Sequence, residues 1–592
     1  MTANVSSSSV GSLPDALRVD LAAAGLLPPL PRAFLAGGDL DLLSPLRFLP
    51  PGELPAMPAV SAAARAAPAG GRSRAELAAA LLASNRSYGH LNAEAACKRL
   101  ADPATRVVVA GQQPGLFGGP LMTFAKLVAA ARWAAALEAA GEPAVAVFWV
   151  ATEDHDYAEV ASATVLTAGG PRGFDLGPDT QPLLPVGMRA LSPAVTEVLH
   201  AIAEAVPGER YAEWLRTVAR WYQPEARFGE SFCRVMASML GSRCPLLLDA
   251  MHPVLKQAER PWLARLIERR GALAAALARQ DAAVEGRGYE LRVHPQPGAS
   301  PLFLLRHGQR RRIEWRGGEG FALRGTDGTD RTAGADRTAG AAGTAGADRT
   351  VASAASAAST GTPGAADAAG VGELLRILDE NPSVVSPGVL ARPAIADAVL
   401  GTTLQVLGPG ELSYMPQAAA VYGVLEIEAP WVALRPQTLV LDPAKAQHLE
   451  AAGLTLGELL GERSRLDRAL AERAGGDFVA PVRARIAAAL DELRAPALAA
   501  DPHLERPLAK TREQVLRAVD LFAEKAMPSL ARRDELLSRR VEALLQTCLP
   551  GGKPQERVIC AAHFQGKYGD RLAASFWEQL ELDPTMLAVI LP

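Results

Sequence analysis

The chain of 592 residues has almost no net charge and few aromatic side chains. Its 61 lysines and arginines nearly balance its 64 aspartates and glutamates, which leaves a formal charge of -3. Proteins that bind nucleic acid usually present a basic surface. Proteins that bind single strands also stack bases on aromatic side chains. Aromatic residues make up only 5% of this chain. The composition therefore predicts no nucleic-acid partner.

Cysteine is also scarce, with five residues in the whole chain: Cys97, Cys233, Cys244, Cys548 and Cys560. None of them form a CxxC pair, and their spacing does not match a zinc finger. We expect reduced thiols, some of them in the core, as in a reducing compartment. No metal site is predicted.

Long apolar runs and a secretion signal are missing as well. Residues 1–12 are polar and rich in serine, and no stretch of 18 apolar residues lacks charge. Hydrophobic residues make up 49% and charged residues 21%, which is ordinary for a globular protein, and the length predicts two to four structural units. We expect a cytoplasmic protein with no membrane partner.

The first clear structural unit spans residues 106–150. An apolar run at 106–109 leads into the glycine-rich turn GQQPGLFGGP (111–120), then a helix to about Ala140 and a second apolar run at 144–150. This order predicts a strand, a helix and a parallel strand. A helix over 73–100 is expected before it, with a capping box at Ser73 and Glu76.

Three more apolar runs, at 245–248, 403–407 and 431–434, each end in polar or glycine-rich sequence. The pattern predicts an α/β fold with an open parallel sheet interrupted by insertions. In such sheets, ligands bind beyond the carboxyl ends of the strands.

The domain organisation follows from these runs. Core segments are expected at 1–164, 226–255 and 379–441, insertions at 165–225 and 256–378, a helical coiled coil at 442–549 and a C-terminal tail that packs on the core at 550–592. In the second insertion we expect helix to about Arg287, then strands at 290–293, 302–306 and 311–315. The low-complexity segment 325–370 is predicted to be a disordered loop.

The helical coiled coil is typical of a packing or dimerisation element. Pro507 and Pro528 are expected to break its helices.

The glycine-rich turn is the first candidate site. A turn of this kind before a helix exposes backbone amides and so attracts anions, but it matches neither a Walker A motif nor GxGxxG. Gln112 and Gln113 are suited to hydrogen bonding a polar substrate. Lys126 lies about two turns into the helix, and the alternative is that it is merely a solvated lysine.

The second candidate is ATEDHDYAEV (151–160), which follows a strand directly. Glu153, Asp154, His155, Asp156 and Glu159 together are able to act as acid and base or, less favourably, to bind a metal. The alternative is a polar strand end in which Asp154 or Asp156 caps the next helix.

The third candidate combines SPGVLARP (386–393) with GPGELSYMPQ (408–417). Arg392 is suited to pairing with a carboxylate in bidentate fashion, and Glu411 to holding an amine. The alternative is an internal Arg–Glu pair. No GxSxG nucleophile motif occurs.

These motifs, taken in order with the late PQERV (554–558), resemble the BshC family, the cysteine-adding enzymes of bacillithiol biosynthesis. The resemblance covers about 85–592. It implies a Rossmann-like core similar to class I aminoacyl-tRNA synthetases, two connecting-peptide insertions and a C-terminal coiled coil used in homodimerisation. It also implies a ligase that adds L-cysteine to glucosaminyl-malate, the last step in making this low-molecular-weight thiol.

The mechanism expected from the resemblance activates cysteine with a nucleotide. ATP is the candidate activator, although the sequence identifies no cofactor. The turn at 111–119 would hold phosphate or malate oxygens, His155 or Asp156 would deprotonate the sugar amine, Glu411 would bind an ammonium, and Arg392 or Arg435 a malate carboxylate. The candidate catalytic residues are Glu153, His155 and Asp156, and the candidate binding residues are Gln112, Gln113, Gly115, Gly118, Gly119, Lys126, Asp154, Ser386, Arg392, Gly410, Glu411, Tyr414, Gln417 and Arg435.

Two alternatives remain open. One is a regulatory or binding protein that retains the core without catalysis. The other is a different aminoacyl transferase, dependent on ATP or on tRNA.

Overall fold

A computed structural model describes residues 13–54, 73–294, 296, 298–317, 320–324, 369–475, 479–531 and 535–592. Most of the loop predicted at 325–370, and the N-terminal residues 1–12, lie outside this part of the chain. Among the described residues, no helix combines the length and apolar character that crossing a bilayer requires.

A six-stranded sheet forms the centre of the protein, and all of its neighbouring strands are parallel. Its order is β1 (Arg47–Phe48), β13 (Trp431–Leu434), β12 (Thr402–Leu407), β2 (Arg106–Gln112), β3 (Ala144–Val150) and β6 (Leu246–Asp249). The predicted open parallel sheet is therefore confirmed.

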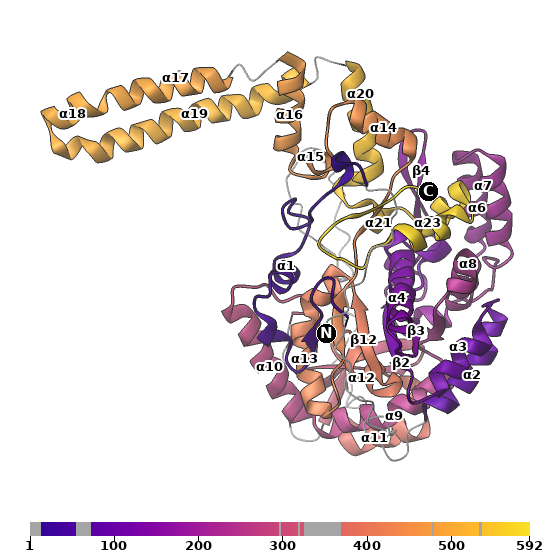
Figure 1. Ribbon diagram of the computed structural model, residues 1–592. Coiled ribbons are helices and arrows are strands. Elements are labelled where there is room, and N and C mark those ends of the chain that lie inside the picture. The colour runs from indigo at the N-terminus through magenta and orange to yellow at the C-terminus, as the bar shows by residue number, and fades with distance from the viewer. Residues whose placement is uncertain are drawn as a thin grey trace, which may run out of the picture.

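The predicted strand–helix–strand unit at 106–150 is also confirmed. Strands β2 and β3 pair in register from Arg106–Ala144 to Gln112–Val150, and α4 (Leu121–Ala139) connects them (Figure 1). Because α4 is apolar on nearly every face, it is buried between the sheet and the C-terminal tail. The carboxyl ends of β2, β3 and β12 consequently lie at one edge of the sheet.

The helix expected over 73–100 is two helices, α2 (Arg74–Ser87) and α3 (Ala93–Ala101). Ser73 accepts a hydrogen bond from the amide of Glu76, and the Glu76 carboxylate accepts from the amide of Ser73, so the predicted capping box is confirmed.

The first insertion holds a hairpin of β4 (Ser162–Thr167) and β5 (Gly170–Asp175). The short helix α5 (Tyr157–Val160) precedes the hairpin, and α6 (Ala194–Ala205), α7 (Glu209–Ala219) and α8 (Phe228–Leu240) follow it. The second insertion begins with two helices, α9 (Pro253–Glu268) and α10 (Arg270–Gly286).

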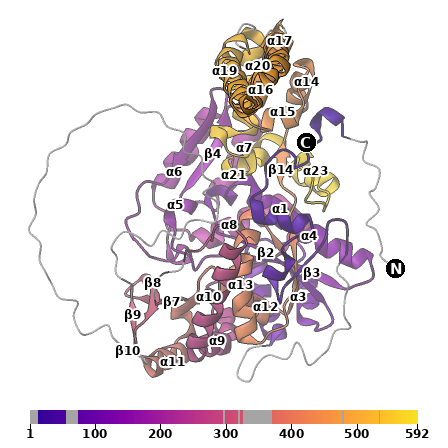
Figure 2. The same cartoon turned by 90° about the vertical axis from the view of Figure 1, so that its left-hand side faces the viewer.

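A second, antiparallel sheet follows these helices and lies beside α10 (Figure 2). The Arg270 guanidinium of α10 lies 6.0 Å from the centre of the Trp315 ring. Its strands are β10 (Ala369–Gly370), β9 (Gly320–Leu323), β8 (Gln309–Trp315), β7 (Ala299–Arg306) and β11 (Val385–Pro387), in that order. The strand predicted at 290–293 is wrong. The backbone of Val293 hydrogen bonds with the side-chain amide of Gln417 instead of a neighbouring strand.

The C-terminal helices include α16 (Arg463–Gly475), α17 (Val479–Glu492), α18 (Arg494–Ala500), α19 (Glu505–Ala531) and α20 (Glu535–Cys548). Helices α17 and α19 run side by side as an arm that projects away from the core (Figure 1). The predicted breaks at Pro507 and Pro528 are wrong, since α19 continues through both. Pro507 lies in the first turn, where a missing amide hydrogen costs no helical hydrogen bond.

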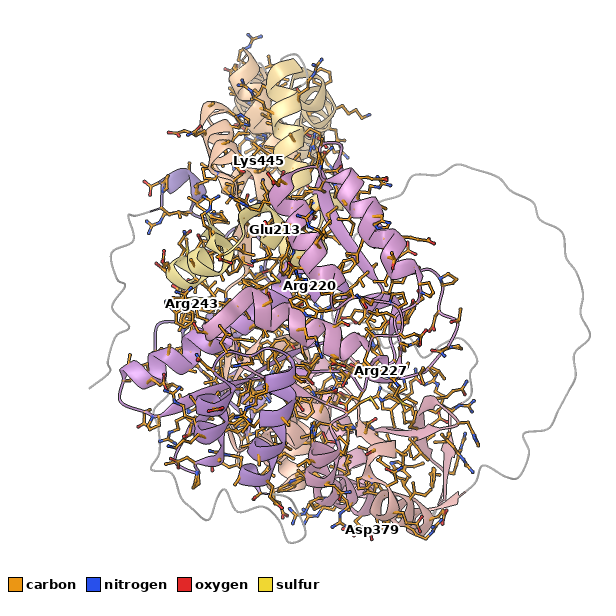
Figure 3. All side chains as sticks on the ribbon, turned by 90° about the vertical axis from the view of Figure 1, so that its right-hand side faces the viewer. Glu213, Arg220, Arg227, Arg243, Asp379 and Lys445 are labelled. Carbon is orange, nitrogen blue, oxygen red and sulfur yellow. The ribbon has the colours of Figure 1, made fainter. Side chains whose placement is uncertain are left out.

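The tail after the arm comprises α21 (Gln555–Val558), α22 (Ala561–Tyr568), α23 (Arg571–Gln579) and β15 (Ala588–Ile590). It packs on the core: the Phe576 ring lies 5.1 Å from Phe124 of α4, and β15 pairs with β14 (Thr438–Val440). Lys445 of α14 (Pro443–Ala451) marks the base of the helical arm, and Asp379 of α11 (Val371–Glu380) marks the opposite end of the molecule (Figure 3).

Candidate active site

A cleft of about 1950 Å³ opens at the carboxyl edge of the parallel sheet. Its walls include the residues that follow β2, β3 and β12, together with parts of the second insertion and of the C-terminal tail. This is where the topology of an open parallel sheet predicts a ligand.

The glycine-rich turn contributes less to this cleft than predicted. Gly119 lines it, but a side chain on Gly115 would meet the Cα of Gly119 at 2.6 Å, and one on Gly118 would meet Met236 at 2.8 Å. The amides of Gly115, Gly118 and Gly119 are hydrogen bonded within the turn, to the carbonyls of Gln113, Gly115 and Leu116. The premise that these amides face an anion is therefore wrong, and Gly115 and Gly118 are needed for close packing.

The C-terminal tail fixes the same turn from outside. The amide of Leu121 donates to the carbonyl of Ile559 at 2.8 Å, and the amide of Ala561 donates to the carbonyl of Gly119 at 2.9 Å. One wall of the cleft thus depends on residues that are distant in sequence.

Lys126 is buried beneath the turn, so the alternative of a solvated lysine is wrong. Its ammonium donates to the Gly111 carbonyl at 3.0 Å and the Gln112 side-chain oxygen at 2.7 Å, and pairs with Glu411 at 2.6 Å. Burial lowers the pKa of Lys126, although Glu411 opposes the shift. Lys126 therefore joins the end of β2 to the start of α13 (Pro409–Leu425).

Glu411 binds an ammonium, as predicted from its residue type, but that ammonium belongs to Lys126. The same carboxylate oxygen also accepts a hydrogen bond from the amide of Gly408 at 2.7 Å. Its neighbour Gly410 lies in the first turn of α13, which faces the cleft. The first amides of a helix have no acceptor within it and attract anions, so this turn is a candidate phosphate site.

Glu153 is buried and is not among the residues that line the cleft. Its two carboxylate oxygens pair with the ammonium of Lys256 at 2.6 Å and with Arg392 at 2.9 Å. Lys256 pairs in turn with Glu259 at 2.8 Å, in the interior of α9. This arrangement holds the end of β3 in place and leaves Glu153 no access to a substrate.

Asp154 has three side-chain partners in the cleft. It accepts from Arg392 at 2.6 Å, from Arg310 at 3.3 Å and from Gln113 at 3.3 Å. Burial raises the pKa of Asp154, but Arg392 and Arg310 outweigh it, so the net shift is downward. The carboxylate therefore stays ionised, which suits it to binding rather than to proton transfer.

Arg310 of β8 was not predicted. It donates to Ser386 at 2.9 Å and to the Pro387 carbonyl at 2.8 Å, and it approaches the Nδ1 atom of His155 at 3.3 Å. Burial lowers its pKa, although Asp154 opposes the shift. Arg310 thereby contacts Ser386, Asp154 and His155, which lie in segments far from it in sequence.

Asp156 caps α5, because its carboxylate accepts a hydrogen bond from the amide of Glu159 at 3.3 Å. This confirms the alternative in which Asp156 is a helix cap. The Glu159 side chain is accessible to solvent within the cleft, and it accepts from Gln112 at 3.4 Å. Its enclosed position, with help from Asp156 and Asp154, raises the pKa of Glu159 to about 7.

Arg435 and Gln417 are packing groups. Arg435, which is 1% exposed, forms two parallel bonds with Glu556 at 2.9 and 2.7 Å. Gln417 is equally buried and donates to Asp281 and to the Val293 carbonyl, both at 2.8 Å. Tyr414 lines the cleft, and burial raises its pKa.

The cleft also has basic lining residues. Arg557 of α21 and Arg292 of the second insertion both line the cleft. Burial lowers the pKa of Arg557 to about 10, and Arg292 adds to the shift. Two guanidinium groups in the cleft favour an anionic ligand.

Four groups that shape the site were missed: Lys256, Arg310, Glu556 and Arg557. The last two lie in the late PQERV motif, so the motif was a usable signal for them. Nothing in the local sequence distinguishes Lys256 or Arg310 from a surface cation.

The chain matches two family models of known proteins. Residues 59–331 and 369–436 match "Bacillithiol biosynthesis BshC, N-terminal Rossmann-like domain", and residues 438–587 match "Bacillithiol biosynthesis BshC, C-terminal coiled-coil domain". A protein of Salinibacter ruber is 28% identical over 555 residues, which cover 91% of this chain and 93% of the relative. A protein of Thermus thermophilus is 31% identical over 481 residues, 80% of this chain and 86% of the relative. Both relatives carry the name "Putative cysteine ligase BshC".

Proposed function

This chain belongs to the BshC family of bacillithiol biosynthesis, and from that premise we propose that it is the ligase that joins the carboxyl group of L-cysteine to the amine of glucosaminyl-malate. The observation that carries the proposal is the convergence of the family motifs on one cleft. Gln112 and Gln113 lie at the end of β2, Asp154 and His155 follow β3, and Glu411 follows β12.

The charges of the cleft suit these substrates. Glucosaminyl-malate carries an amine and two carboxylates, and both carboxylates and guanidinium groups line the cleft. The malate carboxylates are assigned to Arg292 and Arg557, because both line the cleft. Arg392 and Arg435 each pair with a carboxylate of the protein itself.

Activation of the cysteine carboxyl group is assigned to ATP. The phosphates would bind at the first turn of α13, near Gly410, where helix amides attract anions. Gln113, Asp154 and His155 would bind polar groups of cysteine or of the sugar. The five buried, unbridged cysteines support a reducing cytoplasm as the location of the reaction.

We expect the purified protein to form bacillithiol from glucosaminyl-malate, cysteine and ATP, and to form none when ATP is omitted. Mass spectrometry of the thiol-labelled product measures both reactions, and cysteine-dependent exchange of pyrophosphate into ATP tests adenylation. Product without ATP would contradict the activation step, and no product under any condition would favour a regulatory protein. In the latter case, site variants would still restore bacillithiol to a deletion strain.

The helical arm is proposed to form a homodimer. Three of its apolar side chains stay largely in solvent: Val482 at 41%, Leu521 at 50% and Phe522 at 57% exposure. Between α17 and α19, a short seam of Val479, Val519 and Ala523 packs together. Exposed apolar surface of this kind is typical of an interface with another chain.

Phe522→Asp is expected to convert the dimer to a monomer, because a carboxylate placed in an apolar interface has to be desolvated without a partner. Sedimentation velocity at micromolar concentration measures the change. Leu91→Asp is the control, since Leu91 is 71% exposed on the core and far from the arm. A Phe522→Asp variant that sediments like the wild type would rule out this interface.

A further inference from the structure

The proposed reaction needs a base that receives the proton of the attacking amine, and no residue has been assigned to this role so far. Three carboxylates at the strand ends are occupied: Glu153 by Lys256 and Arg392, Asp154 by Arg392 and Arg310, and Glu411 by Lys126. A carboxylate that is paired with a buried cation is held in its ionised state and is a weak base.

His155 is also poorly suited to this task. A guanidinium group only donates hydrogen bonds, so in the 3.3 Å contact with Arg310 the Nδ1 atom of His155 is the acceptor. The ring proton is then on Nε2, so this neutral tautomer has no acceptor nitrogen free of Arg310. A proton added at Nδ1 would point at the guanidinium.

Glu159 differs from these groups in its partners. Lys126 donates to the side-chain oxygen of Gln112, which fixes the amide so that its nitrogen faces a carboxylate oxygen of Glu159 at 3.4 Å. The Glu159 side chain is exposed to the cleft, and among the described residues no cation lies within ion-pair distance of it. One neutral donor thus orients the carboxylate and leaves it basic.

The surroundings of Glu159 come from four elements. Asp156 at the start of α5 and Asp154 after β3 raise its pKa, whereas Lys126 of α4 and Arg392 of α12 (Arg392–Leu400) lower it. Enclosure in the cleft is the largest influence, and the resulting pKa of about 7 is suited to a base that works near neutral pH.

We propose that Glu159 is the general base of amide formation. The inference rests on the proposed function. The neutral amine of glucosaminyl-malate attacks the carbonyl carbon of cysteine activated as an acyl adenylate, and a C–N bond forms. The bond from that carbon to the phosphate oxygen breaks, its electron pair leaves with the nucleotide, and the nitrogen gives its surplus proton to Glu159, which later releases it to water.

Glu159→Gln tests the assignment, because the amide preserves the shape of the side chain but accepts no proton. We expect kcat to fall by about 10²–10⁴-fold with a small change in KM. In the wild type, kcat should fall tenfold for each pH unit below about 7, where Glu159 becomes protonated. That dependence should vanish in Glu159→Gln.

Two further variants make the result specific. Glu285→Gln changes another exposed carboxylate of the same cleft and should keep both kcat and its pH dependence. His155→Gln should lower the rate through weaker substrate binding but keep the pH dependence. If Glu159→Gln retains more than a tenth of the wild-type kcat with the same pH profile, the assignment is wrong although the ligase activity stands. If the wild type forms no amide, both the proposed function and the base assignment fail.

Discussion

Replacing Glu556 by alanine is expected to lower the free energy of unfolding by about 3–5 kcal/mol. Glu556 and Arg435 are each 1% exposed and are joined by two hydrogen bonds, and Glu556 also accepts from the amide and the hydroxyl of Thr438, both at 2.8 Å. The variant would leave a guanidinium charge in the interior without its counter-charge. Urea unfolding followed by tryptophan fluorescence measures the loss.

Two comparisons separate the buried charge from other effects. The double variant Arg435→Met with Glu556→Met should be more stable than Glu556→Ala, since no isolated charge remains. Glu94→Ala removes an exposed partner of Arg86 and should change stability by less than about 1 kcal/mol. A Glu556→Ala protein as stable as Glu94→Ala would show that the buried pair contributes little.

At pH 8, Lys256→Met is expected to lower the free energy of unfolding by about 3–5 kcal/mol, and the loss should shrink as the pH falls. The substitution keeps an unbranched chain of similar volume but removes the ammonium between Glu153 and Glu259. Glu153 keeps Arg392 as a partner, whereas Glu259 is left buried with no cation. Most of the lost stability should therefore come from the unpaired Glu259 carboxylate.

Glu259 determines whether the stability of the Lys256→Met variant rises or falls with pH. Burial raises its pKa from the ordinary 4.5 to about 7, against the opposing effect of Lys256, so between these two pH values the folded protein holds a proton that the unfolded chain has released. Without Lys256 that pKa rises further. Lower pH then favours the folded state of the variant, and its stability should recover between pH 8 and pH 5.

Urea midpoints of wild type and Lys256→Met across this range test the expectation. Lys256→Met combined with Glu259→Gln should be nearly independent of pH, because the group that takes up the proton is gone. If the difference in stability between wild type and Lys256→Met stays constant from pH 8 to pH 5, Glu259 is not the titrating group.

The sheet could be predicted from the sequence because its signals are local. Apolar runs such as 144–150 end in a glycine-rich or acidic turn, and parallel strands bring those ends to one edge. The positions of Gln112, Asp154 and Glu411 around one cleft follow from that rule alone.

The partners within the site could not be predicted in the same way. Lys256 is 103 residues from Glu153, and Arg310 is 155 residues from His155, so no periodicity relates them. Arg435 and Gln417 have the residue types of a binding site, yet Arg435 pairs with Glu556, and Gln417 bonds with Asp281 and Val293. Residue type identified which groups are polar, but only the tertiary contacts determine which of them are available to a ligand.

The contacts of Ile559 and Ala561 with the glycine-rich turn have a consequence for biosynthesis of the protein itself. Ribosomes reach Ala561 more than four hundred residues after Gly119, which takes on the order of tens of seconds. Until then the turn lacks these two hydrogen bonds, even if the sheet behind it has already folded. A nascent or prematurely terminated chain would therefore lack part of one wall of the cleft, which would be completed only after the final stretch of translation.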